Sequence, residues 1–294
     1  MSPPQAALSV DFEYFTHLPA YRGARGTTDL PAVGLDGVTS LLDAFDRAEA
    51  TGTFFTVGEI ADSNPDVLRR VADAGHEIGS HTHTHRHLSE LSESERRDEL
   101  STSKARLDAV ADTEVTGFRA PSFDVASDHF RTLADLGYEY DSSVVPCRSI
   151  PGWYGGEYEA ELPSPANEID PAAPGDVVEV PVSVMPGLRL PLTGTWIRFF
   201  GVSYTILGMR MLARRGVPPV LYVHPWELVD LPAVEGVPKR VYVRTGDYMR
   251  RAVRRILDEP FEFVATGDLA ARVGSSAAGT TDSETTDPVP PERE

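Results

Sequence analysis

The feature that most constrains the fold of this 294-residue sequence is an alternation between short apolar runs and longer stretches with helical apolar spacing. The run "AALSVDF" at residues 6–12 predicts a buried strand, and "LDGVTSLLDAFDRAEATG" at residues 35–52 predicts a helix that ends by Gly52. Later strand candidates are "TFFTVG", "HEIGS", "VTGFRA", "YEYDSS", "VVEVPV", "PVLYVHP" and "FEFVAT". Strands alternating with helices predict an α/β fold with a mainly parallel sheet, either doubly wound or closed as a barrel.

Two of the predicted helices carry recognisable start signals. The stretch "SNPDVLRRVADAG" offers Asn64 as a candidate cap, Pro65 in the first turn and Gly75 as the stop. The stretch "LSESERRDELSTSKARLDAV" pairs Ser92 with Glu95 three residues later, which predicts a capping box.

Three segments depart from the regular alternation. Residues 146–176 are rich in Pro and Gly, which predicts an irregular excursion over one face. Residues 194–212 place apolar side chains at helical spacing, which favours core packing over a membrane-touching face. Residues 273–294 are polar and predict a disordered acidic tail after one domain at residues 1–272.

The charge of the chain excludes one class of partner. The formal net charge is −18, which argues against nucleic acid, because a phosphate backbone requires basic partners. Lys104 and Lys239 are the only lysines, against 25 arginines. An acid-rich, lysine-poor composition predicts a halophilic protein, and the alternative is a codon bias toward arginine.

No apolar run reaches the length of a membrane span, so we expect no stable membrane insertion. The first residues lack the pattern of a secretory signal, which predicts a cytoplasmic location. A single cysteine, Cys147, excludes an internal disulfide and a zinc site made of thiolates. Any metal must therefore be held by His, Asp and Glu, and a homo-oligomer remains possible.

Histidines gather in "GHEIGSHTHTHRHL" at residues 75–88, which holds five of the eight in the chain. His81 and His85 are four residues apart, as one face of a helical turn requires, but so are His83 and His87. On a strand all four would share a face. Spacing alone therefore does not decide between a metal site and a solvated polar run. It also does not decide which histidines would be the ligands.

Polar side chains recur where predicted strands end. Asp11 and Glu13 end the first strand, and an acid there is costly unless it is paired, hydrogen-bonded or bound to a metal. Arg119, Asp141 and His224 follow later strands. Each could be a cap, a surface ion pair or a satisfied core residue. Together they point to the rim of a parallel α/β fold, where active sites lie.

The same residues carry a resemblance. The chain resembles the polysaccharide deacetylases with a NodB homology domain (carbohydrate esterase family 4) over about residues 5–272. The segments that correspond to family motifs are "SVDFEYF", "HTHTH", "FRAPSF" and "LYVH". It is most similar to the intracellular branch whose first motif is Asp-x-Asp or Asp-x-Glu and whose last continues as "HPWE".

The resemblance implies a distorted (β/α) barrel of about seven strands that binds a divalent metal, usually zinc. It implies Asp11 as general base, His224 as general acid, and Glu13, His81 and His85 as metal ligands. His83 and His87 would then face solvent or lie behind the ligands.

Three further roles follow from the same resemblance and its chemistry. Arg119 would orient the general base, and Asp141 would support the general acid. A backbone N–H near Ser122 or Phe123 would stabilise the tetrahedral oxyanion together with the metal.

The function expected on this basis is N-deacetylation of an N-acetylated sugar in a glycan or glycan precursor. One alternative on the same fold is hydrolysis of a small cyclic amide or imide. Another is a catalytically silent glycan-binding domain, which the presence of base, ligands and acid disfavours.

Overall fold

The computed structural model describes residues 2–24, 33–150 and 158–278. Within these ranges, seven short strands run parallel in the order β7-β5-β4-β3-β2-β1-β8. They are β1 (Gln5–Phe12), β2 (Thr53–Thr56), β3 (Glu77–Ser80), β4 (Gly117–Phe118), β5 (Tyr140–Asp141), β7 (Val178–Glu179) and β8 (Val220–Val223). Strand β6 (Ser164–Pro165) adds to β7 in antiparallel direction, and β9 (Glu262–Phe263) pairs with the start of β1.

The chain that follows β7 brings the two ends of this sheet together. The Val182 N–H donates to Val144 O at 2.9 Å, and the Ser183 N–H donates to Val220 O in β8 at 2.8 Å. The Val220 N–H in turn donates to Ser183 Oγ at 2.9 Å. The parallel strands thereby close into a distorted barrel, which confirms the predicted fold class.

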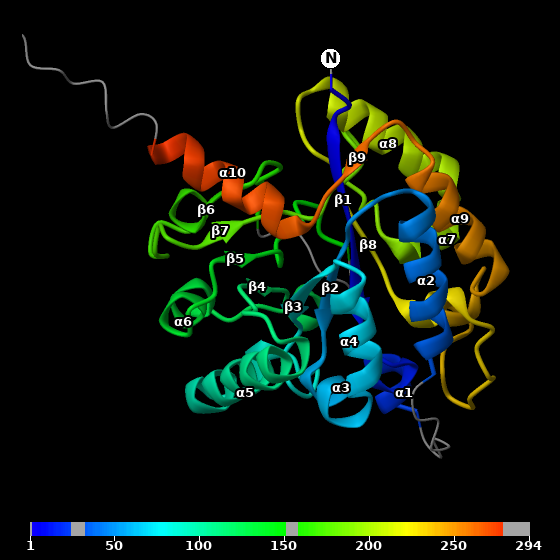
Figure 1. Ribbon diagram of the computed structural model, residues 1–294, viewed down its shortest axis with the longest axis horizontal. Coiled ribbons are helices and arrows are strands. Elements are labelled where there is room, and N and C mark those ends of the chain that lie inside the picture. Colours follow the sequence, from blue (N-terminus) through cyan, green and yellow to red (C-terminus); the bar gives the residue numbers. More distant parts are fainter. Residues whose placement is uncertain (1, 25–32, 151–157, 279–294) are drawn as a thin grey trace, which may run out of the picture.

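Helices enclose the strands (Figure 1). They are α1 (Pro19–Arg22), α2 (Leu35–Arg47), α3 (Gly58–Ser63), α4 (Pro65–Asp73), α5 (Glu93–Ala111), α6 (His129–Asp135), α7 (Gly194–Phe200), α8 (Val202–Arg214), α9 (Asp247–Leu257) and α10 (Thr266–Ala278). In α10, Leu269 and Ala270 share an apolar cluster with Ala7 and Val220, near the starts of β1 and β8. Helix α10 therefore covers the end of the barrel opposite to the carboxyl ends of the strands.

The alternation of side chains along β1 separates the apolar core from the site. Leu8, Val10 and Phe12 belong to the large cluster beneath the helices. The residues between them face the inside of the barrel, because successive side chains on a strand point to opposite faces. Ser9 and Asp11 there both contact Arg119, a buried arginine at the end of β4. A period of two thus directs the polar side chains of "SVDFEYF" inward.

The predicted capping box is present. Ser92 Oγ accepts the Glu95 N–H, and the Ser92 N–H donates to Glu95 Oε2 at 2.9 Å, so both groups at the start of α5 are satisfied. Asn64 does precede α4, but its side chain does not cap that helix. Its Oδ1 accepts the Tyr14 hydroxyl instead, so a tertiary contact has replaced the local one.

Residues 194–212 form two helices rather than one. Gly201, at φ +91°, separates α7 from α8. The expected core packing is right for Trp196 and wrong for Phe200 and Leu207, which are 53% and 54% exposed, because the break turns the two helix faces differently.

The expected excursion at 146–176 contains β6 and a short 3-10 turn (Ala166–Glu168), while residues 151–157 lie outside the described residues. Helix α10 continues to Ala278, so the expected start of the tail at residue 273 is too early. Residues 279–294 also lie outside the described part. No helix within the described ranges is long and apolar enough to cross a membrane.

Candidate metal centre and active site

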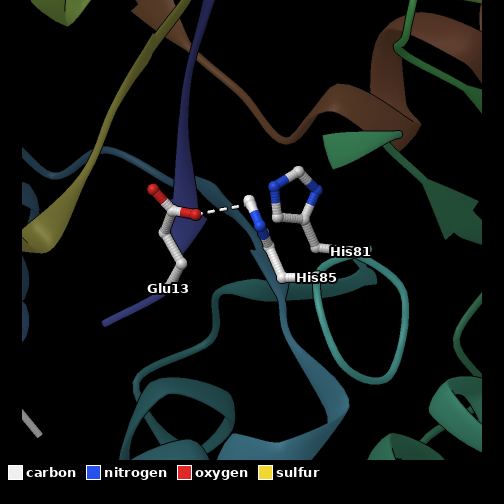
Figure 2. A group of neighbouring side chains, drawn as sticks. All are labelled: Glu13, His81 and His85. Atoms are coloured by element: carbon white, nitrogen blue, oxygen red, sulfur yellow. Dashed lines mark ion pairs between the residues drawn. The ribbon is translucent and has the colours of Figure 1, made fainter. Parts of the chain in front are cut away.

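Three predicted ligands meet at the carboxyl ends of β1 and β3. Figure 2 shows Glu13, His81 and His85 directed toward one another. One ligand atom from each lies within 4.8 Å of the others, and all three side chains are buried. His85 Nε2 lies 2.5 Å from Glu13 Oε2. The structure therefore brings together the three residues that the sequence proposed as ligands.

The loop between His81 and His85 is built to place both rings on one side. Thr82 and His85 adopt left-handed backbone angles, at φ +59° and +57°, which a β-branched threonine rarely does. Thr82 Oγ1 accepts the His85 N–H at 3.1 Å. Glu99 of α5 accepts the N–H groups of His83 and Thr84 at 3.0 and 2.8 Å. These bonds hold a turn that neither helix nor strand spacing describes.

The two other histidines of the motif lie elsewhere. The His83 ring contacts Gly58 at the start of α3, where a Cβ would come within 2.7 Å of its Nδ1. His87 Nε2 lies 3.2 Å from Ser122 Oγ, and its Nδ1 lies 3.7 Å from Glu90. His87 does line the pocket described below, whereas neither ring joins the cluster of three ligands.

The donors of the cluster fit a divalent cation. His81 Nδ1 lies 2.7 Å from the Arg119 carbonyl, so its other ring nitrogen is available. Burial lowers the pKa of His81 to about 4, which keeps the imidazole neutral, as a ligand must be. His85 Nδ1 is buried without a hydrogen-bond partner, and Glu13 Oε2 faces His85 Nε2. One carboxylate and two imidazoles form a donor set typical of zinc and related metals.

Glu13 is held as a carboxylate from both sides. The Trp226 indole N–H donates to Glu13 Oε1 at 3.0 Å. Burial alone would raise the pKa of Glu13, but the charge of His85 and its hydrogen bond hold that pKa well below the usual range. An ionised carboxylate is the form that ligates a metal.

Arg119, at the end of β4, fixes Asp11. The guanidinium is completely buried, and its Nη1 donates to Asp11 Oδ1 and to Ser9 Oγ, both at 2.7 Å. Its Nη2 donates to Ser142 Oγ at 2.7 Å, and its Cζ lies 4.2 Å from the centre of the Phe55 ring. Arg119 therefore lies where the sequence placed it, and the Asp11 that it binds lines the pocket described below.

His224 lies directly after β8, with its Nε2 3.7 Å from Oε1 of the candidate ligand Glu13. Its Nδ1 lies 3.3 Å from Glu227 Oε2, and its ring stacks on Trp226 with centroids 4.9 Å apart. Arg198 of α7 donates from Nε to Glu227 Oε1 at 2.7 Å. Burial alone would lower the pKa of His224, but the hydrogen bond and charge of Glu227 raise it above the ordinary value.

The expected support of His224 by Asp141 is wrong. Asp141 is fully buried on the outer face of β5, where its Oδ2 lies 2.8 Å from Nε2 of His129 in α6. The reason is the period of two along a strand: the next residue, Ser142, faces inward and binds Arg119. Glu227 takes the position beside His224 that the resemblance gave to Asp141.

The segment proposed for the oxyanion follows β4 as a short 3-10 turn (Pro121–Phe123). Ser122 and Phe123 have left-handed backbone angles, at φ +54° and +58°, and both line the pocket. The Phe123 N–H donates to Ala120 O at 3.0 Å, so it is already used. Of the two N–H groups expected there, that of Ser122 is the remaining candidate.

One pocket of about 610 Å³ is lined by Asp11, Glu13, His81, His85, Ser122, Phe123 and His224. Sequence reasoning missed Glu227, although it lies in the quoted "HPWE", and it missed Arg198, which no local pattern marks. It also missed His17, whose buried ring lies parallel to His85 with centroids 6.0 Å apart.

Two family models match the chain. The polysaccharide deacetylase model matches residues 29–140, and a domain of unknown function, DUF3473, matches residues 142–271. Residues 29–140 therefore match the polysaccharide deacetylase family. The first model covers His81, His85 and Arg119, and the second covers the region that supplies His224, Glu227 and Arg198.

The chain is also similar to individual proteins. It is 23% identical over 176 residues to a peptidoglycan deacetylase of Helicobacter pylori, which is 56% of this chain and 60% of that protein. The chain spans 38–60% of the length of the first curated relatives that it matches.

Solved structures share the fold. A Mycobacterium smegmatis protein assigned as a polysaccharide deacetylase superposes with a TM-score of 0.65 at 23% identity, covering 98% of both chains. The Puue allantoinase superposes with a TM-score of 0.60 at 17% identity, covering 92% of this chain and 90% of its own. At these identities the similarity concerns the barrel alone.

Proposed function

We propose that the protein is a metal-dependent hydrolase that removes the acetyl group from the nitrogen of an N-acetylated sugar. The observation that carries this proposal is the convergence of an arginine-held Asp11, the Glu13–His81–His85 cluster and a carboxylate-held His224 on one pocket. Amide hydrolysis needs a base, an electrophile and an acid, and this pocket offers one candidate for each.

A divalent cation held by Glu13, His81 and His85 would polarise the amide carbonyl and make water more acidic. Asp11, held by Arg119, takes the proton of the attacking water as its oxygen bonds to the carbonyl carbon. The Ser122 N–H faces the oxyanion that develops. His224 then donates its proton to the nitrogen while the C–N bond breaks, because an amide anion is too basic to leave. The products are acetate and a free amine.

The substrate class rests on the relatives. Curated relatives are named peptidoglycan, chitooligosaccharide and chitin deacetylases, which supports an N-acetylated carbohydrate here. We infer zinc as the metal from the nitrogen-rich donor set. The cytoplasmic location, the high-salt environment and a homo-oligomer stay predictions.

A cyclic amide or imide is the second candidate, favoured by the fold shared with an allantoinase. Metal analysis of the purified protein, combined with acetate release from N-acetylglucosamine oligomers and ring opening of cyclic imides, separates the two. We expect about one metal per chain and acetate release. Ring opening without acetate release would contradict the proposal, and a metal-free protein inert on both would favour a silent binding domain.

A further inference from the structure

Arg240 is a charged side chain of the pocket that the proposed chemistry does not use. It lies in the 3-10 turn η6 (Lys239–Tyr242), lines the pocket beside Val241, and is exposed. Within residues 2–24, 33–150 and 158–278, its guanidinium makes neither an ion pair nor a hydrogen bond. A cation without a partner is unexpected in a chain whose net charge is −18.

The other arginine and the carboxylates that line the pocket are engaged. Arg198 is paired with Glu227, and Asp11 is paired with Arg119. Glu13 belongs to the ligand cluster, and Asp124 accepts the N–H and the hydroxyl of Ser89, both at 2.8 Å. Among the described lining residues, Arg240 therefore supplies positive charge that no protein carboxylate neutralises.

The backbone beneath Arg240 is tied to the general acid. Arg198 Nη1 donates to the carbonyls of Arg240 and Val241 at 3.4 and 2.8 Å. The Nε of the same arginine binds Glu227, whose other oxygen contacts His224. One buried guanidinium thus fixes both the imidazole of the acid and the turn that presents Arg240 to the same pocket.

We propose that Arg240 binds an anionic group of the substrate, so that the preferred substrate is an N-acetylated sugar that carries a carboxylate or a phosphate. This inference rests on the proposed deacetylation. The planar guanidinium donates two parallel hydrogen bonds to either group, which is why arginine recognises both. A pocket of about 610 Å³ has room for a sugar and an attached group.

The test compares substrates that differ in charge. N-Acetylglucosamine oligomers are neutral, N-acetylmuramic acid carries a carboxylate, and N-acetylglucosamine 1-phosphate carries a phosphate. For Arg240→Gln, we expect the ratio of kcat/KM on the better anionic sugar to that on the neutral oligomer to fall at least about tenfold, mainly through KM. The comparison of N-acetylmuramic acid with N-acetylglucosamine 1-phosphate decides between a carboxylate and a phosphate.

Lys239→Gln is the matched control, because it removes the same charge from the neighbouring residue, which does not line the pocket. It should leave the ratio unchanged. The inference is overturned if Arg240→Gln and Lys239→Gln change the ratio equally, or if the wild type prefers the neutral oligomer.

Direct titration of the two anionic sugars into the protein separates this inference from the proposed function. Binding that weakens in Arg240→Gln and not in Lys239→Gln supports anion recognition even if no acetate is released. Binding that is the same in all three proteins contradicts it, whatever the turnover.

Discussion

The described part of the chain contains two buried arginine–carboxylate pairs with the same nitrogen–oxygen distance but different positions relative to the pocket. Arg119 holds Asp11, and Arg198 holds Glu227, each with one nitrogen–oxygen distance of 2.7 Å. Both arginines are at most 2% exposed. Asp11 lines the pocket, whereas Glu227 lies behind it and contacts His224. One pair therefore holds Asp11, the proposed base, directly, and the other holds His224, the proposed acid, through Glu227.

The difference teaches where each pair affects the chemistry. Burying an ion pair gains little stability, because desolvation of both charges offsets their attraction. What such a pair supplies is a fixed position. The Arg119 pair fixes the carboxylate of Asp11, the proposed base. The Arg198 pair fixes the imidazole of His224, the proposed acid, through Glu227, so removing Glu227 should weaken that acid without removing it.

Removing the metal should abolish activity whatever the state of the two arginine–carboxylate pairs, so we expect it to have the largest effect. His85→Ala removes one of three proposed ligands, so we expect loss of bound metal and of all measurable turnover. Metal content by mass spectrometry and acetate release are the measurements. His83→Ala is the matched control, because His83 belongs to the same motif but contacts α3, and it should retain metal. Equal metal loss in both variants would point to a diffuse histidine cluster.

Asp11→Asn changes the carboxylate of the Arg119–Asp11 pair. Asn has nearly the same shape but cannot accept the proton of water, so turnover should fall on the order of 10²–10⁴-fold while metal content is retained. Acetate release and metal analysis on the same sample check this. If Asp11→Asn loses the metal and Glu13→Gln keeps it, the roles of the two carboxylates have been exchanged.

Glu227→Gln changes the carboxylate of the Arg198–Glu227 pair, which contacts His224. A general acid works in its protonated form, so activity is lost as pH rises through the pKa of His224. Because Glu227 raises that pKa, the variant should lose activity at lower pH than the wild type. The measurement is the alkaline limb of kcat/KM against pH.

Glu90→Gln is a suitable control for this shift. Glu90 also lies three residues from a histidine, His87, at 3.7 Å, but at the surface. Its alkaline limb should coincide with that of the wild type. A Glu227→Gln limb that does not move, with metal retained, would refute the link between Glu227 and the acid.

Salt should affect the surface and spare both buried pairs, which is the smallest effect. Molar KCl screens the repulsion among 45 acidic residues, so the melting temperature should rise by several degrees from dilute buffer. The pH shift in Glu227→Gln should persist in the same salt, because buried pairs are screened much less. A flat or falling melting temperature would favour codon bias as the origin of the arginine excess.

Much of this site could be predicted from the sequence, because its residues follow the ends of predicted strands. Asp11, His81, Arg119 and His224 follow apolar runs, and parallel strands bring their carboxyl ends to one rim. The error at Asp141 came from ignoring which face of the strand a residue occupies. Applying the alternation of β1 to "YDSS" would have selected Ser142.

Other parts could not be read from local pattern. Arg198 reaches Glu227 from α7, 29 residues earlier in the chain, and only the folded barrel brings them together. The left-handed angles at Thr82 and His85 depend on bonds to Glu99 and within the loop, so spacing alone could not choose between the two histidine pairs.

The central claim is that Asp11 acts as the base and His224 as a separate acid. It is tested most directly by His224→Ala on two substrates. The variant should keep its metal, because His224 is not a proposed ligand, and Asp11 should still deprotonate the attacking water. On an N-acetyl sugar it should lose activity on the order of 10²–10⁴-fold, since the amine must be protonated to leave. On p-nitrophenyl acetate, which the wild type must first be shown to hydrolyse, it should lose far less, because nitrophenolate leaves unprotonated. Equal losses on both substrates at unchanged metal content would contradict the assignment of His224 as the acid.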